Sequence, residues 1–115
     1  MAKVPVTEEL VVKDKKRGDI VIDYSMVNEA AMTIRSINHP IRKKVVELLE
    51  DVDEMNVTEI YVQLRMEQSI VSQHLAILRH AKILKTRREG KFIYYRLNRK
   101  RIKSISTLLN KLAGN

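Results

Sequence analysis

The stretch from Glu67 to Leu97 limits what this chain can fold into more than any other stretch. Its first part places Val71, Leu75 and Leu78 at the i, i+4 and i+7 positions of a helix, expected over about Gln68 to His80. Its second part alternates polar residues with β-branched and aromatic ones, which is the period of a β-strand. A short helix followed at once by a two-stranded hairpin is therefore predicted.

The side of this helix that points away from the three apolar residues is small and polar. It comprises Gln68, Ser69, Ser72, Gln73, Ala76, Arg79 and His80. A generic exposed helix would carry more Glu and Lys, whereas most of these side chains donate or accept hydrogen bonds without a fixed charge. Such a surface suits insertion into a DNA major groove, which is about 12 Å wide.

The hairpin is expected to run from Ile83 to Thr86 and from Phe92 to Leu97, with its turn at Glu89-Gly90. The side chains predicted to face inward are Ile93, Tyr95 and Leu97. The basic side chains on its tip and flanks are Lys85, Arg87, Arg88 and Lys91. These cations are placed to reach phosphates or an adjacent minor groove. The alternative is a hairpin that only covers the core and keeps its charges in water.

Charge is segregated along the chain. Between Lys82 and Lys103 there are ten basic residues and one acid, a net charge of +9, so the rest of the chain carries −1 of the total of +8. From Glu47 to Glu59 there are six acids and no Lys or Arg, a run interpreted as a solvated face. A basic stripe of this kind indicates a polyanion as partner, because Lys and Arg release the counterions condensed on phosphates. The alternative is again a solvated basic face.

Two helices are expected ahead of the acidic run. Ser25 is predicted to cap the first, and Asn38-His39-Pro40 to end it and to open a second that runs to about Glu50. His39 is interpreted as part of that cap rather than as a metal ligand. The apolar face of the second helix comprises Ile41, Val45, Leu48 and Leu49.

Two more helices complete the pattern. Thr58 is predicted to cap a third helix, which carries Ile60, Val62 and Leu64. The turn at residues 65–68 joins it to the helix over 68–80, so the two form a helix-turn-helix. Asn98 is predicted to cap the last helix.

At 115 residues the chain is long enough for one modest core. Residues 1–22 are expected to form a mobile arm, with a possible short strand at Asp19 to Asp23, and residues 23–115 to form one domain. A domain of this kind does not need its first and last helices for its own core, so these are candidates for a symmetric dimer interface. The interface residues are Met26, Ala30, Ile34, Ile102, Ile105, Leu108, Leu109 and Leu112. The alternative is that both helices pack on the monomer.

Several functional classes are excluded by what the chain lacks. It has no cysteine, which excludes disulfides, thiolate metal sites and thiol redox sensing. It also has no Gly-rich phosphate loop and no His pair at metal spacing, since His74 and His80 lie about 240° apart around a helix. No catalytic residue, metal site or cofactor is therefore predicted, and the chain is not expected to be an enzyme. With no apolar run near the roughly 20 residues of a membrane span and no secretory leader pattern, it is expected to be cytoplasmic.

Residues from about Asn38 to Leu97 resemble the winged helix-turn-helix repressors of the ArsR/SmtB type. The resemblance rests on HPIRKKVVELL before the motif, SIVSQHLAILRHAKIL through the helix and its exit, and REGKFIYYRL for the wing. It implies a mostly α fold with a small β-hairpin, in the order α-α-α-α-β-β-α. It also implies a homodimer that binds an imperfect inverted repeat, represses transcription and is released by a signal. Arg65 departs from a common Gly, and Glu67 from a usual capping Ser or Thr.

The metal sites of the resembled family are missing. Metal-responsive members carry a Cys-x-Cys pair on the third helix, where this chain has Glu59-Ile60-Tyr61-Val62-Gln63. Other members place His and carboxylate ligands on the C-terminal helix, and Arg99 to Asn115 contains neither. The metal chemistry of the family is therefore not expected here, and the sequence names no other effector.

The resulting hypothesis is a homodimeric, winged-helix regulator of transcription that binds double-stranded DNA. The residues expected in or beside the major groove are Gln68, Ser69, Ser72, Gln73 and His74, with Gln73 the first choice for base readout. Arg79 and the basic wing residues would mainly hold the backbone. The alternative is a protein-interaction module that docks an acidic partner. Binding of single strands would need aromatic stacking platforms, for which Tyr94 and Tyr95 are too few.

Overall fold

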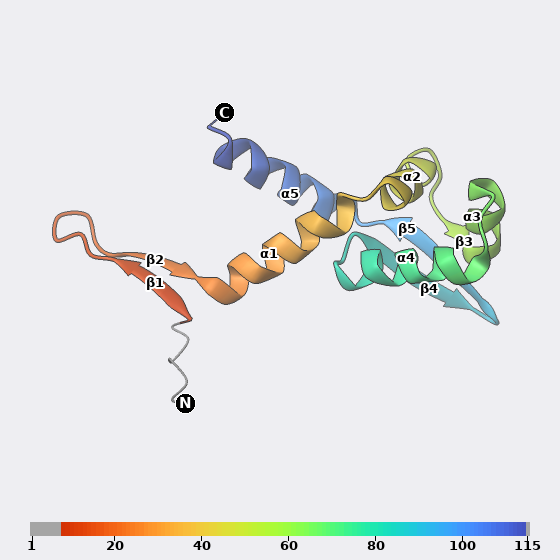
Figure 1. Cartoon of the computed structure of the whole chain (residues 1–115), viewed down its shortest axis with the longest axis horizontal. Coiled ribbons are helices and arrows are strands. Elements are labelled where there is room, and N and C mark those ends of the chain that lie inside the picture. The colour runs from red at the N-terminus through yellow and green to blue at the C-terminus, as the bar shows by residue number, and fades with distance from the viewer. Residues whose placement is uncertain (1–7, 115) are drawn as a thin grey trace. The chain divides into compact units, whose positions relative to one another are not determined.

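The computed structural model describes residues 8–114, so residues 1–7 of the predicted arm and Asn115 lie outside the described residues. The elements are β1 (Glu9–Val12), β2 (Ile20–Asp23), α1 (Tyr24–Ile37), α2 (Pro40–Leu48), β3 (Met55–Asn56), α3 (Val57–Leu64), α4 (Gln68–His80), β4 (Leu84–Glu89), β5 (Phe92–Leu97) and α5 (Arg99–Leu112) (Figure 1). The predicted order α-α-α-α-β-β-α is confirmed. The structure adds the hairpin β1–β2 and the two-residue strand β3.

The chain divides into two compact units, residues 1–32 and residues 33–115, with the division inside α1. The second unit, called the winged module here, holds all of the buried core. Helices α2, α3 and α4 gather around the sheet β3-β5-β4 (Figure 1). The core side chains are Val45, Leu49, Met55, Ile60, Val71, Leu75, Leu78, Ala81, Ile83 and Leu84. The predicted inward face of α4 is thus confirmed, because Val71, Leu75 and Leu78 are all fully buried.

Helix α2 starts as the sequence predicts. Pro40 occupies its first turn, and His39 is the N-cap, whose Nδ1 accepts a hydrogen bond from the Ile41 N–H at 3.1 Å. The interpretation of His39 as a cap is therefore confirmed. The helix ends at Leu48, two residues before the predicted Glu50, and Leu49 packs into the core.

The helix-turn-helix differs from the prediction in the residue that caps α3. Asn56, not Thr58, caps α3: its side chain accepts from the Glu59 N–H at 2.9 Å, and the Glu59 carboxylate accepts from the Asn56 N–H at 3.3 Å. This reciprocal capping box satisfies two donors that would otherwise lack partners. Of the apolar residues of α3, Ile60 is fully buried, whereas Val62 is exposed. The turn itself contains Arg65 in the left-handed region, with φ of 54°, at the position where the resembled family often has Gly.

The wing hairpin is longer than predicted. Strand β4 runs from Leu84 to Glu89, and Glu89 pairs with Phe92, so the two loop residues are Gly90 and Lys91 rather than Glu89 and Gly90. Gly90 has φ of 61°, which a two-residue hairpin loop requires. Tyr95 and Leu97 pack against the core as predicted, whereas Ile93 is exposed because this part of the hairpin extends beyond the core.

Helix α5 is held to the rest of the winged module at its N-terminal end. Asn98 caps it, as predicted, by accepting from the Arg101 N–H. The Arg101 guanidinium donates to the Thr33 hydroxyl at 3.0 Å, and Arg99 donates to the Glu50 carbonyl at 2.7 Å. Among residues 8–114, no helix is long and apolar enough to cross a membrane.

The first unit contains a hairpin that leads into α1. Strand β2 lies where the sequence predicts a short strand, and it pairs with β1 in an antiparallel register. The helix cap differs from the prediction: the Asp23 carboxylate accepts from the Ser25 N–H at 2.9 Å and from its hydroxyl at 2.6 Å, so Asp23 and not Ser25 caps α1. These bonds hold the pKa of Asp23 below its usual value.

Candidate nucleic-acid interface

Helix α4 presents the predicted polar surface. Gln68, Ser69, Gln73, Arg79 and His80 are exposed, and Ser72 and Ala76 are half-buried. Two apolar side chains that the sequence analysis did not place there, Ile70 and Ile77, are also exposed. Because the opposite face of the helix is anchored by three fully buried residues, this surface is presented on a rigid element.

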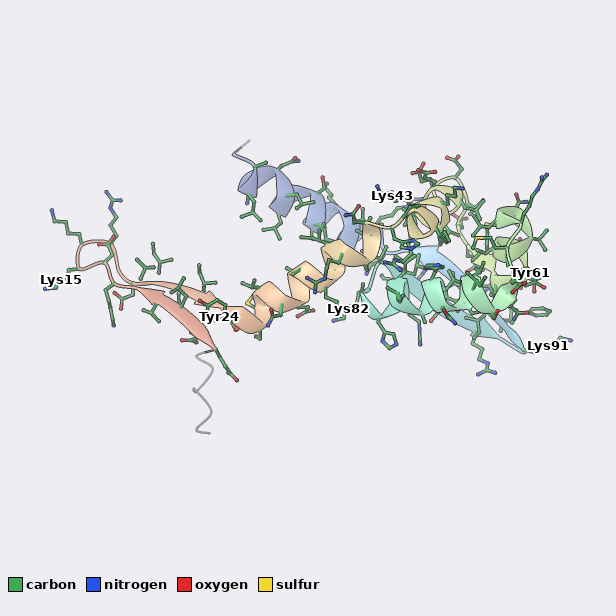
Figure 2. The ribbon with its side chains drawn as sticks, in the orientation of Figure 1. Lys15, Tyr24, Lys43, Tyr61, Lys82 and Lys91 are labelled. Carbon is green, nitrogen blue, oxygen red and sulfur yellow. The ribbon has the colours of Figure 1, made fainter. Side chains whose placement is uncertain are left out.

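The wing has two faces, and the register of its strands assigns each basic residue to one of them. Leu84 is buried and pairs with Leu97, so Thr86 and Arg88 lie on the same, core-side face as Leu84. Lys85 and Arg87 alternate onto the outer face. Arg88 therefore shares the side of the sheet against which the helices pack, and Lys91 occupies the tip (Figure 2).

Arg87 is already paired with acids on the outer face. Its Nε donates to Glu54 Oε2 at 3.1 Å, its Nη1 donates to Glu89 Oε2 at 2.8 Å, and its guanidinium lies 4.6 Å from the ring centroid of Tyr94. The hydrogen bonds that Arg87 donates to Glu54 and Glu89 raise the pKa of Arg87, and the bond that Glu54 accepts lowers the pKa of Glu54. Arg87 is thus a weaker candidate for phosphate contact than Arg88.

The acidic run is mostly exposed, as predicted, and Glu54 is its one half-buried member. Glu54 is half-buried against Arg87, and Glu59 closes the capping box of α3. The two acids therefore have structural roles in addition, whereas Glu47, Glu50, Asp51 and Asp53 remain exposed. Glu54 and Arg87 are 33 residues apart, and no local pattern connects them.

His74 is turned toward α2 instead of lying on the exposed surface of α4. Its ring centroid is 4.7 Å from that of His39, and its Nδ1 is 3.3 Å from Arg42 Nη1. Arg42 is itself fixed by a hydrogen bond from Nε to the Ser36 carbonyl. Burial lowers the pKa of His74, and the neighbouring His39 and Arg42 lower it further. The cluster of His39, Arg42 and His74 connects α4 to the start of α2. The sequence did not predict this contact.

The residues predicted to form a dimer interface fall into two groups. Ile102 and Ile105 pack against the core of the winged module. By contrast, the α5 side chains Leu108, Leu109 and Leu112 are exposed. In the N-terminal helix Met26 is 68% exposed, and Ala30 and Ile34 are half-buried. Exposed apolar side chains thus remain on both helices.

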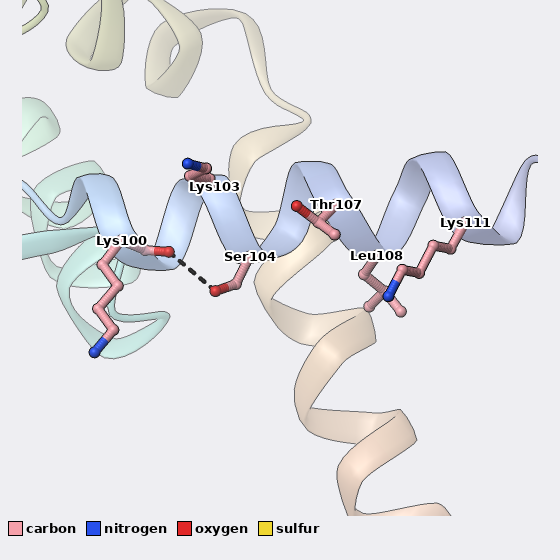
Figure 3. Close-up of a pocket in the computed structure, with 6 residues that line it drawn as sticks. All are labelled: Lys100, Lys103, Ser104, Thr107, Leu108 and Lys111. Carbon is pink, nitrogen blue, oxygen red and sulfur yellow. Dashed lines mark hydrogen bonds between the residues drawn. The ribbon is translucent and has the colours of Figure 1, made fainter. Parts of the chain in front are cut away.

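A recess along one side of α5 is lined mainly by cationic and hydroxyl side chains. Its lining comprises Lys100, Lys103, Ser104, Thr107, Leu108 and Lys111 (Figure 3). The Ser104 hydroxyl donates to the Lys100 carbonyl at 3.0 Å, an ordinary bond within a helix. Within residues 8–114, no group of three or more His, Cys, Asp or Glu residues is arranged to hold a metal ion.

An exposed polar helix beside a basic wing defines a winged helix-turn-helix DNA-binding protein. Residues 39–86 match the family model described as bacterial regulatory protein, arsR family. The chain is 39% identical over 92 residues to the transcriptional repressor PagR of Bacillus anthracis, covering 80% of this chain and 92% of PagR. The chain therefore belongs to the arsR family, and the resemblance found in the sequence is confirmed.

Solved structures agree. The crystal structure of PagR superimposes with a TM-score of 0.62 at 38% identity, covering 76% of this chain and 99% of PagR. HlyU from Vibrio cholerae superimposes with a TM-score of 0.61 at 29% identity, covering 78% of this chain and 97% of HlyU. The curated HlyU of that organism, a transcriptional activator, is 31% identical over 84 residues, covering 73% of this chain and 77% of HlyU. The chain is a DNA-binding transcriptional regulator, and its family and relatives are regulators rather than enzymes.

Proposed function

We propose that the protein is a homodimeric repressor that binds a specific inverted repeat in double-stranded DNA. The observation that carries this proposal is the polar surface of α4, presented on a fully anchored helix beside the core-side face of the wing. In this assignment α4 enters the major groove, and Arg79, Arg88 and Lys91 hold the phosphate backbone. Lys85 and Arg87 lie on the outer face of the wing and have a smaller part in the contact.

Base readout is assigned to the exposed N-terminal half of α4. Gln73 is the principal reader, because a glutamine amide can bond bidentately with adenine N6 and N7. Gln68, Ser69 and Ser72 flank it and supply adaptable hydrogen bonds to bases or phosphates. His74 lies beside the groove, where its contacts with His39 and Arg42 fix the rotation of α4.

The exposed helices support the proposed dimer, and the relatives support the proposed sense of regulation. Exposed leucines on α5 and Met26 on α1 supply apolar surface for a two-fold contact. Such a dimer places its two α4 helices about one turn of DNA apart, roughly 34–36 Å. Repression is favoured over activation because PagR, named a repressor, matches at higher identity than HlyU, named an activator. Regulation does not use the usual metal sites of the family, whose ligands are absent from the sequence.

Replacing Gln73 by alanine tests the readout. The operator is first selected from random duplex DNA, and Kd values for it and for a random duplex of equal length are then measured at one salt concentration. Gln73→Ala is expected to lower the discrimination between the two by about 1–3 kcal/mol, which is at least about fivefold in the Kd ratio. Gln63→Ala, which removes an exposed glutamine from α3, is the matched control and should leave the ratio unchanged.

Two results would contradict the proposal. An unchanged Kd ratio in Gln73→Ala would remove the reading role of that residue. Equal affinity of the wild-type protein for all duplexes, with no motif recovered by selection, would contradict sequence-specific binding altogether. It would favour instead a winged module that docks an acidic protein partner.

A further inference from the structure

The described part of the first unit, residues 8–32, has no core of its own. From residue 8 to residue 32 not one residue is buried, although this segment is rich in large apolar side chains. Those that are exposed are Leu10, Val11, Val12, Ile20, Val21, Ile22, Tyr24, Met26, Val27 and Met32. A two-stranded hairpin by itself is at best marginally stable in water, so this segment needs a partner surface.

The two faces of the hairpin β1–β2 differ in polarity. Leu10 pairs with Ile22 and Val12 pairs with Ile20, and these four side chains share one face. The other face carries the pair Val11 and Val21, flanked by the acidic pair Glu9 and Asp23. One face is therefore wholly apolar and the other is mixed.

Among residues 8–114, no strand other than β2 pairs with β1, so its outer edge is available to another strand. The Tyr24 N–H donates to the Glu8 carbonyl at 2.8 Å, so even-numbered residues of β1 direct their backbone groups toward β2. Glu9 and Val11 consequently direct theirs toward the open edge. An edge of this length with apolar side chains is a template for pairing with another chain.

We infer that β1 pairs antiparallel with β1 of a second copy of this chain, with the two-fold axis at Val11. This register places Leu10 opposite Val12 of the second copy, and Glu9 opposite its Lys13. In this register the apolar faces of both hairpins lie on the same face of the joined sheet. A shift by one residue would place the apolar face of one hairpin and the mixed face of the other on the same face of the sheet. The edge of β2 is less suited to the same pairing, because Asp19 would meet Asp23 of the second copy two positions from the axis, whereas the first like-charged pair in the β1 register, Glu8 and Asp14, lies three positions away.

The exposed apolar surface has the size that such an association needs. The ten side chains of the first unit expose on the order of 900 Å² per chain, close to the ~800 Å² that each partner contributes to a standard interface. Joining the hairpins produces a four-stranded sheet with a continuous apolar face, over which the exposed residues of the two α1 helices can pack. The inference rests on the proposed homodimer and assigns to it a second contact, formed by the N-terminal hairpins.

Single cysteines test the pairing, because the natural chain contains none. Val11→Cys places its thiol at the two-fold axis, where Cα atoms of a hydrogen-bonded antiparallel pair lie about 5.5 Å apart, within the range of a disulfide. Val21→Cys is the matched control: the two valines face each other in the hairpin and are 41% and 54% exposed. Under mild oxidation of the full chain, Val11→Cys is expected to form covalent dimers at least tenfold faster than Val21→Cys.

A charge exchange gives a second readout that does not depend on disulfide geometry. Lys13→Glu is expected to weaken dimerisation about fivefold in analytical ultracentrifugation, since it turns two attractive cross-strand pairs into repulsive ones. Glu9→Lys in the same chain should restore the dimerisation constant to within about twofold. Lys15→Glu makes the same change of charge in the loop and should have no such effect. Lys13 also pairs with Asp19 of its own hairpin at 3.2 Å, a contact that the double variant does not restore.

The outcomes separate this inference from the proposed function. Equal crosslinking of the two cysteines, faster crosslinking through Val21→Cys, or none through either would overturn the pairing of β1 strands. If the wild-type protein is then still a dimer that binds its operator, the proposed function stands without this contact. A monomeric wild-type protein would contradict the homodimer itself, and with it both proposals.

Discussion

The winged module and the N-terminal unit differ in what holds them together. The module buries ten apolar side chains contributed by helices and strands distant in sequence, whereas residues 8–32 bury none. Both segments have clear local structure, with capped helices and a registered hairpin in each. Local sequence signals therefore suffice to specify helices and strands in both segments. Within one chain, however, only the winged module gains free energy from burying apolar side chains. The stability of the N-terminal unit depends on association.

One substitution made in both regions tests this contrast and carries the largest expected effect. Leu75→Ala in the core should lower the free energy of unfolding of the module by about 2–5 kcal/mol, through lost burial and a residual cavity. Leu10→Ala, at a side chain that is 42% exposed in the hairpin, should lower it by less than about 1 kcal/mol. Urea denaturation followed by circular dichroism measures both.

The protein concentration provides the control. If the N-terminal unit depends on association, any effect of Leu10→Ala should diminish at concentrations below the dimerisation constant, and that of Leu75→Ala should not. Equal losses in the two variants at all concentrations would show that the hairpin belongs to the same cooperative core, and the contrast would fail.

A smaller contrast exists within the wing, between two adjacent arginines. Arg88→Ala should weaken binding to operator and random DNA alike and reduce the slope of log K against log salt by about 0.9, the loss of one phosphate contact. Arg87→Ala should change the slope much less, because Glu54 and Glu89 already neutralise that guanidinium. Fluorescence anisotropy titrations between about 50 and 200 mM salt measure the slopes. A larger change of slope in Arg87→Ala would reverse the assignment of the two faces.

The sequence predicted α4 and its buried face because a helix of this length carries its own periodicity. The same holds for the caps His39 and Asn98, each next to the element that it starts. Errors arose where two residues offer the same chemistry: Asn56 and Thr58 are both good caps, and only the backbone path selects Asn56. The exposure of Ile93 was missed because alternation fixes the face of a strand but not how far the core extends.

Contacts between distant residues had no local signal. Glu54 meets Arg87, and His39 meets His74, across 33 and 35 positions of the chain. The two residues of each pair come from different segments of the chain. These segments meet because their apolar side chains pack in one core. The sequence therefore located α4 and its exposed polar surface but did not show which basic residue of the wing is paired with acids, or which histidine is turned inward.

The smallest effect concerns the two histidines of α4, one turned inward and one exposed. Burial and the neighbouring His39 and Arg42 hold the pKa of His74 below its ordinary value of 6.5. Below that pH the unfolded chain binds the proton more readily than the folded one. The contribution of His74 to stability is thus complete above pH 6.5 and is lost as the pH falls from 6.5 toward the lower folded pKa.

Unfolding midpoints in urea at several pH values between about 7.5 and 5.5 measure this loss. His74→Gln should flatten the decline, because the titrating group that prefers to be neutral beside Arg42 has gone. His80→Gln, which removes an exposed histidine from the same helix, is the matched control. The slope of unfolding free energy against pH that His74 contributes cannot exceed that for the uptake of one proton, because one site titrates. An unchanged decline in His74→Gln would mean that His74 is as free to be protonated in the folded module as in the unfolded chain, and its proposed role in fixing the rotation of α4 would lose its support.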